Sequence, residues 1–306
     1  MRCLVTGGAG FIGSHLADAL VQGGHEVTVL DDLSSGKEKN VPEAARLVVQ
    51  DVRNPYAADL IRQERPEVVF HLAAQMDVRR SVADPRFDAD VNIGGTLNLL
   101  EACAEAGTRR FVFASTGGAI YGEQESFPAP ETHPTRPVSP YGCSKASAEL
   151  YLCYYGAEHG LSWVALRFAN VYGPRQDPHG EAGVVAIFCG RLLAGEPCTI
   201  YGDGKQTRDY VYVGDVVRAN LLAMESAFVG PINVGTGVET DVNTLYATLA
   251  KIAGRDAAPE YAEGRPGEQR RSVVAIDRAR EVLGWRPEVT LEEGLRTTYE
   301  WFAAQG

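Results

Sequence analysis

The stretch Thr6-Gly7-Gly8-Ala9-Gly10-Phe11-Ile12-Gly13 decides the fold of this chain. It joins a strand-like apolar run, Arg2–Thr6, to a segment of helical periodicity, Phe11–Gln22, and a second apolar run follows at Glu26–Asp31. Glycines in such a turn let the backbone approach a pyrophosphate and let the helix lie close to the sheet. The N–H groups that open the helix can then bind the anion. The pattern predicts a βαβ unit that binds a dinucleotide.

An acidic residue at the end of the second predicted strand indicates which dinucleotide binds. Asp31 follows Gly13 by 18 positions, close to the roughly 20 expected for a carboxylate that binds a ribose 2′-hydroxyl. The same carboxylate repels a 2′-phosphate. The sequence therefore favours NAD over NADP.

Further apolar runs at Val68–Ala73, Arg110–Ser115 and Trp163–Phe168 alternate with helix-like segments such as Asn92–Glu105. This alternation indicates right-handed βαβ units and a parallel sheet with helices on both faces. We therefore expect an α/β protein with a Rossmann-type, doubly wound parallel sheet.

A second, smaller domain is expected because glycine and proline cluster in loops after Asn170. Loops of this kind on a rigid scaffold commonly carry binding residues. We expect a NAD-binding domain at residues 1–169, joined by a segment near 209–235 that returns to it. A smaller C-terminal α/β substrate domain is expected at 170–208 and 236–306.

Composition and charge exclude several classes of protein. The 306 residues are 45% hydrophobic and 23% charged, as in ordinary globular proteins of about two domains. The 29 basic and 40 acidic residues give a net charge of −11, which disfavours nucleic-acid or membrane binding. The six cysteines show no metal-ligand spacing, and no leader or spanning segment is evident. We expect a soluble, cytoplasmic protein with reduced thiols and no metal.

A second group of residues indicates chemistry. Ser139 suits a helix N-cap and Pro140 the first helical position, so Tyr141 and Lys145 share one face of the helix. A tyrosine serves as a base at neutral pH only if its pKa falls by about 3 units, or about 4 kcal/mol. The Lys145 ammonium, the helix N-terminus and an oxidised nicotinamide would all lower the pKa of Tyr141. The pair is common by chance, but a dinucleotide turn on the same chain favours an active site.

Two hydroxyl residues, Ser115 and Thr116, end a predicted strand at its carboxyl edge, where open α/β sheets bind ligands. Either hydroxyl could hydrogen-bond a reacting sugar oxygen, and we favour Thr116. Both can alternatively cap the strand end.

Taken together, these motifs resemble the extended short-chain dehydrogenase/reductase family, in its UDP-glucose (UDP-galactose) 4-epimerase branch. The resemblance covers nearly the whole chain. Besides the glycine turn and SPYGCSK, it is carried by HLAAQ (His71–Gln75), VNIGGTLNLLEA (Val91–Ala102), ASTGGAIYG (Ala114–Gly122), RFANVYGPRQ (Arg167–Gln176), TRDYVYVGDV (Thr207–Val216), NVGTG (Asn233–Gly237) and GRPGE (Gly264–Glu268).

The resemblance implies a NAD-dependent isomerase that inverts C4 of a UDP-hexose through a transient 4-keto sugar. Its implied catalytic residues are Tyr141, Lys145, Thr116 and Ser115. Its implied cofactor-binding residues are Gly7, Gly10, Phe11, Ile12, Gly13, Asp31, Asp32, Leu33, Ser34, Ser35, Gly36, Asp51, Val52, Leu72, Ala73, Ala74, Gln75, Asn92, Tyr141, Lys145 and Ala169. Its implied substrate-binding residues are Thr116, Tyr141, Asn170, Val184, Thr199, Tyr201, Arg208, Arg265 and Glu268.

Two departures from the family pattern bear on the substrate. Gly117 stands where relatives that dehydrate or decarboxylate nucleotide sugars carry an acid, which favours epimerisation. Ser272 matches a position where residue size sets how bulky a sugar can be, so a UDP-GlcNAc or UDP-glucuronate 4-epimerase is an alternative. A non-catalytic dinucleotide sensor is another. The segment ASTGGAIYG is also one residue longer than in many relatives, which leaves open whether Ser115 or Thr116 faces the sugar.

The family resemblance further implies a homodimer. The helix Asn92–Glu105 and the helix after Pro140 carry apolar residues at Leu97, Leu100, Leu150 and Tyr154. Such faces can be buried against the sheet, but in this family the two helices commonly build a four-helix interface.

Overall fold

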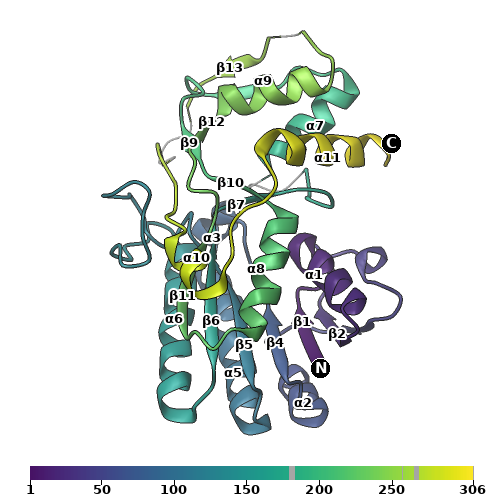
Figure 1. Ribbon diagram of the computed structural model, residues 1–306, viewed down its shortest axis with the longest axis vertical. Coiled ribbons are helices and arrows are strands. Elements are labelled where there is room, and N and C mark those ends of the chain that lie inside the picture. The colour runs from purple at the N-terminus through teal and green to yellow at the C-terminus, as the bar shows by residue number, and fades with distance from the viewer. Residues whose placement is uncertain (179–182, 257, 265–268, 306) are drawn as a thin grey trace.

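A seven-stranded parallel sheet forms the centre of the larger part of the molecule (Figure 1). The computed structural model describes residues 1–178, 183–256, 258–264 and 269–305. The strands lie in the order β11 (Gly230–Val234), β6 (Trp163–Phe168), β5 (Arg110–Thr116), β4 (Val68–His71), β1 (Arg2–Thr6), β2 (Glu26–Asp31) and β3 (Arg46–Val49). The predicted Rossmann-type sheet is thus confirmed, and the order reverses between β1 and β4.

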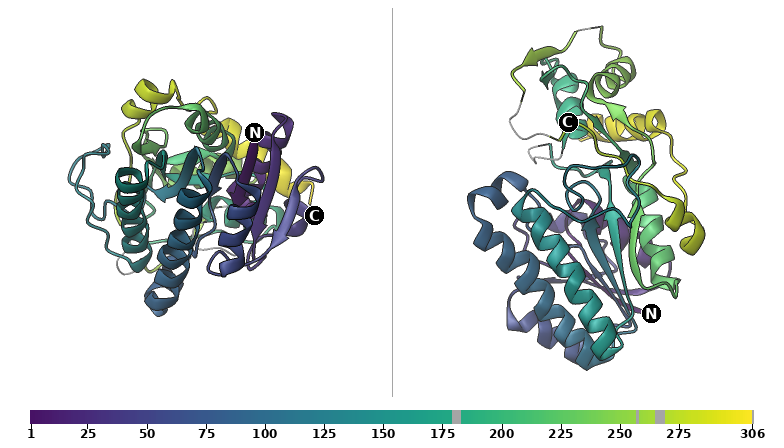
Figure 2. Two further views of the ribbon diagram at one scale, coloured as in Figure 1. Left: turned by 90° about the horizontal axis from the view of Figure 1, so that it is seen from below. Right: turned by 90° about the vertical axis from the view of Figure 1, so that its left-hand side faces the viewer.

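Helices cover both faces of this sheet (Figure 2). One face packs against α1 (Phe11–Gln22), α8 (Val213–Glu225) and α10 (Asp277–Leu283); the other packs against α2 (Pro55–Glu64), α5 (Gly95–Ala106) and α6 (Pro140–His159). Within β1, Cys3 and Val5 enter one apolar core while Leu4 enters the other. This is the alternation of a strand that is buried on both faces.

The smaller part has its own apolar core, which lies above the sheet in Figure 1. Helices α7 (Val184–Ala194), α9 (Val242–Ile252) and α11 (Leu291–Ala303) contribute to it. Short strand pairs connect the segments: β7 (Asn170–Tyr172) with β10 (Tyr210–Tyr212), β9 (Thr207–Arg208) with β12 (Thr240–Asp241), and β8 (Thr199–Tyr201) with β13 (Glu260–Ala262).

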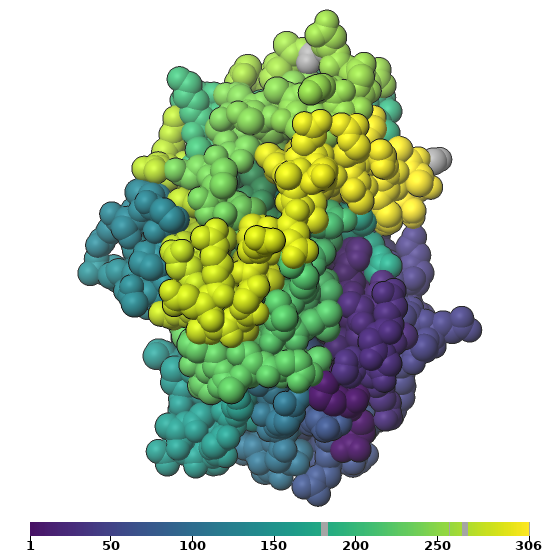
Figure 3. All heavy atoms as spheres, in the orientation of Figure 1, coloured from purple at the N-terminus to yellow at the C-terminus, as the bar shows by residue number. Residues whose placement is uncertain are grey.

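The C-terminal segment spans both parts of the molecule. In Figure 3 it runs in yellow across one face, from α11 above to α10 below. Ala279, Leu283 and Trp285 belong to the apolar core on the α1 and α8 face of the large sheet. We therefore propose the domain division expected from the sequence with one change, in which α10 and Trp285 belong with the nucleotide-binding part.

Between β4 and α5 the chain forms elements that the sequence did not predict. These are α3 (Val78–Ala83), α4 (Pro85–Ala89) and a turn of π-helix, η2 (Asp90–Gly94), so the helix expected from Asn92 begins as regular α5 at Gly95. A 3₁₀ turn, η1 (Glu38–Asn40), follows β2. In the described residues, every helix is too short or too polar to cross a membrane.

Candidate active site

The carboxyl ends of neighbouring parallel strands bring the predicted site residues to one edge of the sheet. Gly7 follows β1, Asp31 ends β2 and the segment 72–75 follows β4. Thr116 ends β5, and Asn170 begins β7, two residues after the end of β6. This edge, at the reversal of strand order, is where open α/β sheets bind their ligands.

The glycine turn is packed backbone against backbone. Gly7 has a φ of +70°, and a Cβ placed there would lie 2.6 Å from the Ala73 nitrogen. A Cβ on Gly13 would lie 2.1 Å from the Gly7 oxygen. Only glycine fits at either position, as predicted for a turn that a phosphate approaches.

The start of α1 leaves hydrogen-bond donors for an anion. Its N-cap, Gly10, provides no side-chain cap. Among the residues that the structure describes, the N–H groups of Phe11 and Ile12 have no hydrogen-bond acceptor. Free donors at the positive end of a twelve-residue helix suit a pyrophosphate.

Asp31 holds the loop after β2 against this turn. Its Oδ2 accepts a hydrogen bond from the Ala9 nitrogen at 2.9 Å and its Oδ1 accepts one from the Leu33 nitrogen at 2.8 Å. Burial raises the pKa of Asp31 above its ordinary value. Each oxygen keeps a further lone pair for a ribose hydroxyl. The glycine cradle, the uncapped helix and this carboxylate together fit NAD.

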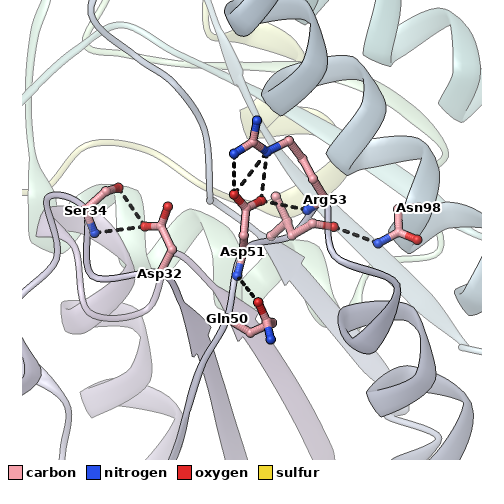
Figure 4. A network of polar contacts seen from close by, with 7 residues as sticks. Asp32, Ser34, Gln50, Asp51, Arg53 and Asn98 are labelled. Carbon is pink, nitrogen blue, oxygen red and sulfur yellow. Dashed lines mark hydrogen bonds and ion pairs between the residues drawn. The ribbon is translucent and has the colours of Figure 1, made fainter.

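The residues expected around the adenosine lie at the next two strand ends (Figure 4). Asp32 accepts hydrogen bonds from both the nitrogen and the hydroxyl of Ser34, at 2.9 and 2.6 Å. The Arg53 guanidinium contacts both carboxylate oxygens of Asp51 and lowers the pKa of that carboxyl. Val52 lies between Asp51 and Arg53, and its carbonyl accepts a hydrogen bond of 2.7 Å from the Asn98 side chain. This bond holds the backbone of the segment in place.

The predicted catalytic residues meet at the start of α6. Ser139 caps this helix by accepting a hydrogen bond from the Gly142 nitrogen at 3.1 Å. The side chains of Tyr141 and Thr116 share a hydrogen bond. The Lys145 Nζ lies 5.9 Å from the centre of the Tyr141 ring and donates to the Ala114 carbonyl at 2.9 Å.

The pKa of Tyr141 in the protein alone is raised above its ordinary value. Burial, the larger cause, and the negative charge of Asp88 together raise it to about 12, while the hydrogen bond with Thr116 opposes the rise. Burial also lowers the pKa of Lys145 to about 8. The expectation of a lowered pKa for Tyr141 includes the positive charge of an oxidised nicotinamide, so for the complex with NAD it stays a prediction.

The structure separates the two hydroxyl residues at the end of β5. Ser115 donates a hydrogen bond of 2.6 Å to Glu149 Oε1. Glu149 also forms a buried, bidentate ion pair with Arg167, with contacts of 2.6 and 3.0 Å. Ser115 thus joins this buried network, while Thr116 contacts Tyr141 at the start of the same helix.

Sequence reasoning missed this network and a further buried carboxylate, Asp88. Asp88 is 1% exposed and accepts hydrogen bonds from the side-chain amides of Gln75 and Asn92, both at 3.1 Å. The available signal was spacing: Asp88 precedes Asn92 by four residues, which places both on one helical face.

Apart from Thr116 and Tyr141, the residues expected to bind substrate lie in the segments after β6. A Cβ on Gly118 would lie 3.9 Å from both Thr116 Oγ1 and Asn170 Oδ1, so these two groups flank one open space. Arg208 on β9 is half-buried, as are Thr199 on β8 and Val184 at the start of α7, while Tyr201 on β8 is exposed. The predicted Arg265 and Glu268 lie outside the described residues.

Gly117 has no room for a side chain. A Cβ there would lie 2.8 Å from Val274 Cγ1 and 3.2 Å from the Arg167 carbonyl oxygen. The acid that eliminating relatives carry could not be placed here without displacing Val274. Ser272, the other departure from the family pattern, is 3% exposed.

The fold and the site define a NAD-binding enzyme of the short-chain dehydrogenase/reductase type, and comparison with known proteins supports this. The sequence model of the NAD dependent epimerase/dehydratase family matches residues 3–235. The chain belongs to this family.

Similarity to individual members extends over the full length. The chain is 49% identical to a UDP-glucose 4-epimerase of Mycolicibacterium smegmatis, over 99% of this chain and 98% of that protein. It superposes with a TM-score of 0.98 on a UDP-glucose 4-epimerase from Thermotoga maritima solved with UDP-glucose, at 52% identity and with 100% and 99% of the two chains covered. For a UDP-glucose 4-epimerase from Thermus thermophilus in complex with NAD, the TM-score is 0.94 and the identity is 50%, and both chains are fully covered.

Proposed function

We propose that this protein is a NAD-dependent UDP-glucose 4-epimerase, an isomerase that interconverts UDP-glucose and UDP-galactose. The observation that carries the proposal is the group of Thr116, Tyr141 and Lys145, which lies on the same edge of the sheet as the glycine turn. The full-length similarity to UDP-glucose 4-epimerases, at about 50% identity, supports it.

Tyr141, Thr116 and Lys145 have separate roles in the reaction. Bound NAD would supply the hydride chemistry at C4 of the sugar. Tyr141, as phenolate, takes the proton of the sugar 4-hydroxyl and later returns it. Thr116 hydrogen-bonds the same oxygen, and the Lys145 ammonium stabilises the negative phenolate.

Inversion requires the 4-keto sugar to rotate within the site, so that hydride returns to its other face. We propose that Arg208, with Arg265, binds the diphosphate during this rotation, because a guanidinium is planar and permanently charged. Asn170, Val184, Thr199, Tyr201 and Glu268 are proposed as further substrate contacts. At Gly117 there is no room for the acidic side chain that elimination would need, which supports epimerisation.

The decisive experiment incubates the purified protein separately with UDP-glucose, UDP-galactose, UDP-GlcNAc and UDP-glucuronate and separates the products. We expect UDP-glucose and UDP-galactose to interconvert without net formation of NADH. Accumulation of NADH would instead indicate a dehydrogenase. Bound NAD without turnover of any sugar would indicate a dinucleotide sensor.

We also propose that the enzyme is a homodimer that pairs through α5 and α6. Leu100 is buried, but Leu150 on α6 is 72% exposed and Tyr154 is 52% exposed, so these two do not pack on the sheet. Large exposed apolar side chains on neighbouring turns suit a helix interface. Light scattering should give twice the chain mass, and Leu150→Glu should reduce it to one chain. A monomeric wild type would contradict the pairing.

The six cysteines are all free thiols. This supports a reducing compartment, and we propose that the enzyme acts in the cytoplasm.

A further inference from the structure

A buried carboxylate that the proposed mechanism does not use lies beside the catalytic pair. Asp88 on α4 accepts its two amide hydrogen bonds through Oδ2. Its Oδ1 is buried and has no hydrogen-bond partner among the described residues. A carboxylate placed so far from water is costly unless a positive charge faces it. Asp88 acts electrostatically on both Tyr141 and Lys145.

The amide partners of Asp88 connect it to the start of α6. Asn92 pairs with the backbone of Gln75 in both directions, at 2.9 Å each. The same Asn92 amide donates to Ser144 Oγ at 3.1 Å, and Ser144 donates to the Tyr141 carbonyl at 2.9 Å. Asp88 therefore lies at the base of a continuous chain of hydrogen bonds that ends at Tyr141.

Two carboxylates, Asp88 and Glu149, raise the pKa of Lys145, but they differ in whether a cation already pairs with them. Glu149, on the same helix, is matched by the bidentate guanidinium of Arg167. Within the described part of the chain, the hydrogen-bond partners of Asp88 are the uncharged amides of Gln75 and Asn92. His71 on β4 brings no charge at neutral pH, because burial, together with the charge of Lys145, lowers its pKa to about 3. The Asp88 carboxylate is thus the negative group left to balance Lys145.

We propose that Asp88 is a positioning residue of the active site. Its carboxylate fixes the amides of Gln75 and Asn92, which connect through Ser144 to the Tyr141 carbonyl. It also supplies the negative charge that keeps Lys145 an ammonium ion. The consequence for catalysis rests on the proposed function, but the effect on Lys145 does not.

The negative charge of Asp88 determines the direction in which the pKa values of Lys145 and Tyr141 change. Burial lowers the pKa of Lys145 to about 8, and Asp88 opposes that fall. Asp88 also raises the pKa of Tyr141. Removing the negative charge therefore lowers both pKa values, and Lys145 loses its proton in the neutral range. The phenolate of Tyr141 then lacks its cation.

Lysine NMR measures this directly and without substrate. The chain has five lysines, all in described segments: Lys37, Lys39, Lys205 and Lys251 are exposed, and Lys145 is buried. Protein labelled with ¹³C at the lysine ε carbon gives one titration per lysine, and Lys145→Arg identifies the buried one. We expect Lys145 to titrate near pH 8 in the wild type. In Asp88→Asn we expect its pKa to fall by about one unit.

Two further variants separate charge from shape. Asp88→Ser is also neutral but smaller, so it should lower the pKa of Lys145 similarly and serves if the Asn variant does not fold. Asp90→Asn removes an equal charge from an exposed position two residues away and should leave the pKa unchanged. A wild-type pKa of Lys145 in the neutral Asp88 variants would overturn the proposal.

The pH dependence of kcat/KM with UDP-galactose provides the functional readout. The acidic limb of the profile reports the deprotonation of Tyr141, and the basic limb reports the loss of the Lys145 proton. Both limbs should move to lower pH by about one unit in Asp88→Asn. A purely structural role would lower kcat with both limbs unmoved, and would overturn the proposal. If the wild type shows no epimerase activity, the proposed function fails while the NMR result still decides the role of Asp88.

Discussion

The substitution Gly13→Ala probes the turn on which the cofactor assignment depends. The added Cβ would lie 2.1 Å from the Gly7 oxygen, 2.8 Å from the Gly7 carbonyl carbon and 2.9 Å from the Gly8 Cα. All three atoms are backbone, so no side chain can move aside. The shortest contact is about 1.3 Å below the 3.4 Å of ordinary contact, and the turn must open.

Overpacking of this kind costs about 1–3 kcal/mol. If the cost falls on the bound turn, the Kd for NAD rises by about 5- to 150-fold, since 1.4 kcal/mol is a factor of ten. If it falls on the folded state, the melting temperature drops by several degrees, at roughly 2–4 °C per kcal/mol.

The assay combines NAD titration by calorimetry with thermal unfolding of the NAD-free protein. Gly94→Ala is the matched control, because nothing lies within 4 Å of a Cβ at that helical position. The control should bind NAD normally and gain about 0.5–1 kcal/mol of stability. Unchanged NAD affinity and melting temperature in Gly13→Ala would refute the account of the turn.

Other predictions concern the cofactor, the pH profile and the strand-end hydroxyls. Asp31→Ala should relax the preference for NAD over NADP, measured as the ratio of the two Kd values; an unaltered ratio would remove Asp31 from this role. Because burial lowers the pKa of Lys145 to about 8, its ammonium is present below that pH and lost above it, so kcat/KM should fall above about pH 8. A profile that stays flat to pH 10 would contradict this. Ser115→Ala should cost about 1–2 kcal/mol of stability through Glu149 with kcat retained, whereas Thr116→Val should lower kcat about 100-fold or more; equal losses of kcat would contradict the separation of the two hydroxyls.

Elements defined by local signals were predictable from the sequence. β1, α1, β2 and β6 begin and end at the predicted residues, because periodicity and the glycine turn specify them within a few neighbouring positions. The start of α6 followed from Ser139 and Pro140 in the same way.

Features that depend on distant packing were not predictable. The bond between Ser115 and Glu149 requires β5 to lie beside α6 in a definite register. The Arg167–Glu149 pair likewise joins β6 to α6. The burial of Asp88 beside the catalytic helix depends on the packing of α4 against α6, which the sequence does not indicate.

The most direct test of the central claim is the turnover of Tyr141→Phe, measured with its NAD content. The substitution removes only the phenolic oxygen that shares a hydrogen bond with Thr116. The account predicts that the variant retains NAD while UDP-galactose epimerisation falls by about 10³-fold or more. Epimerisation at the wild-type rate would contradict it.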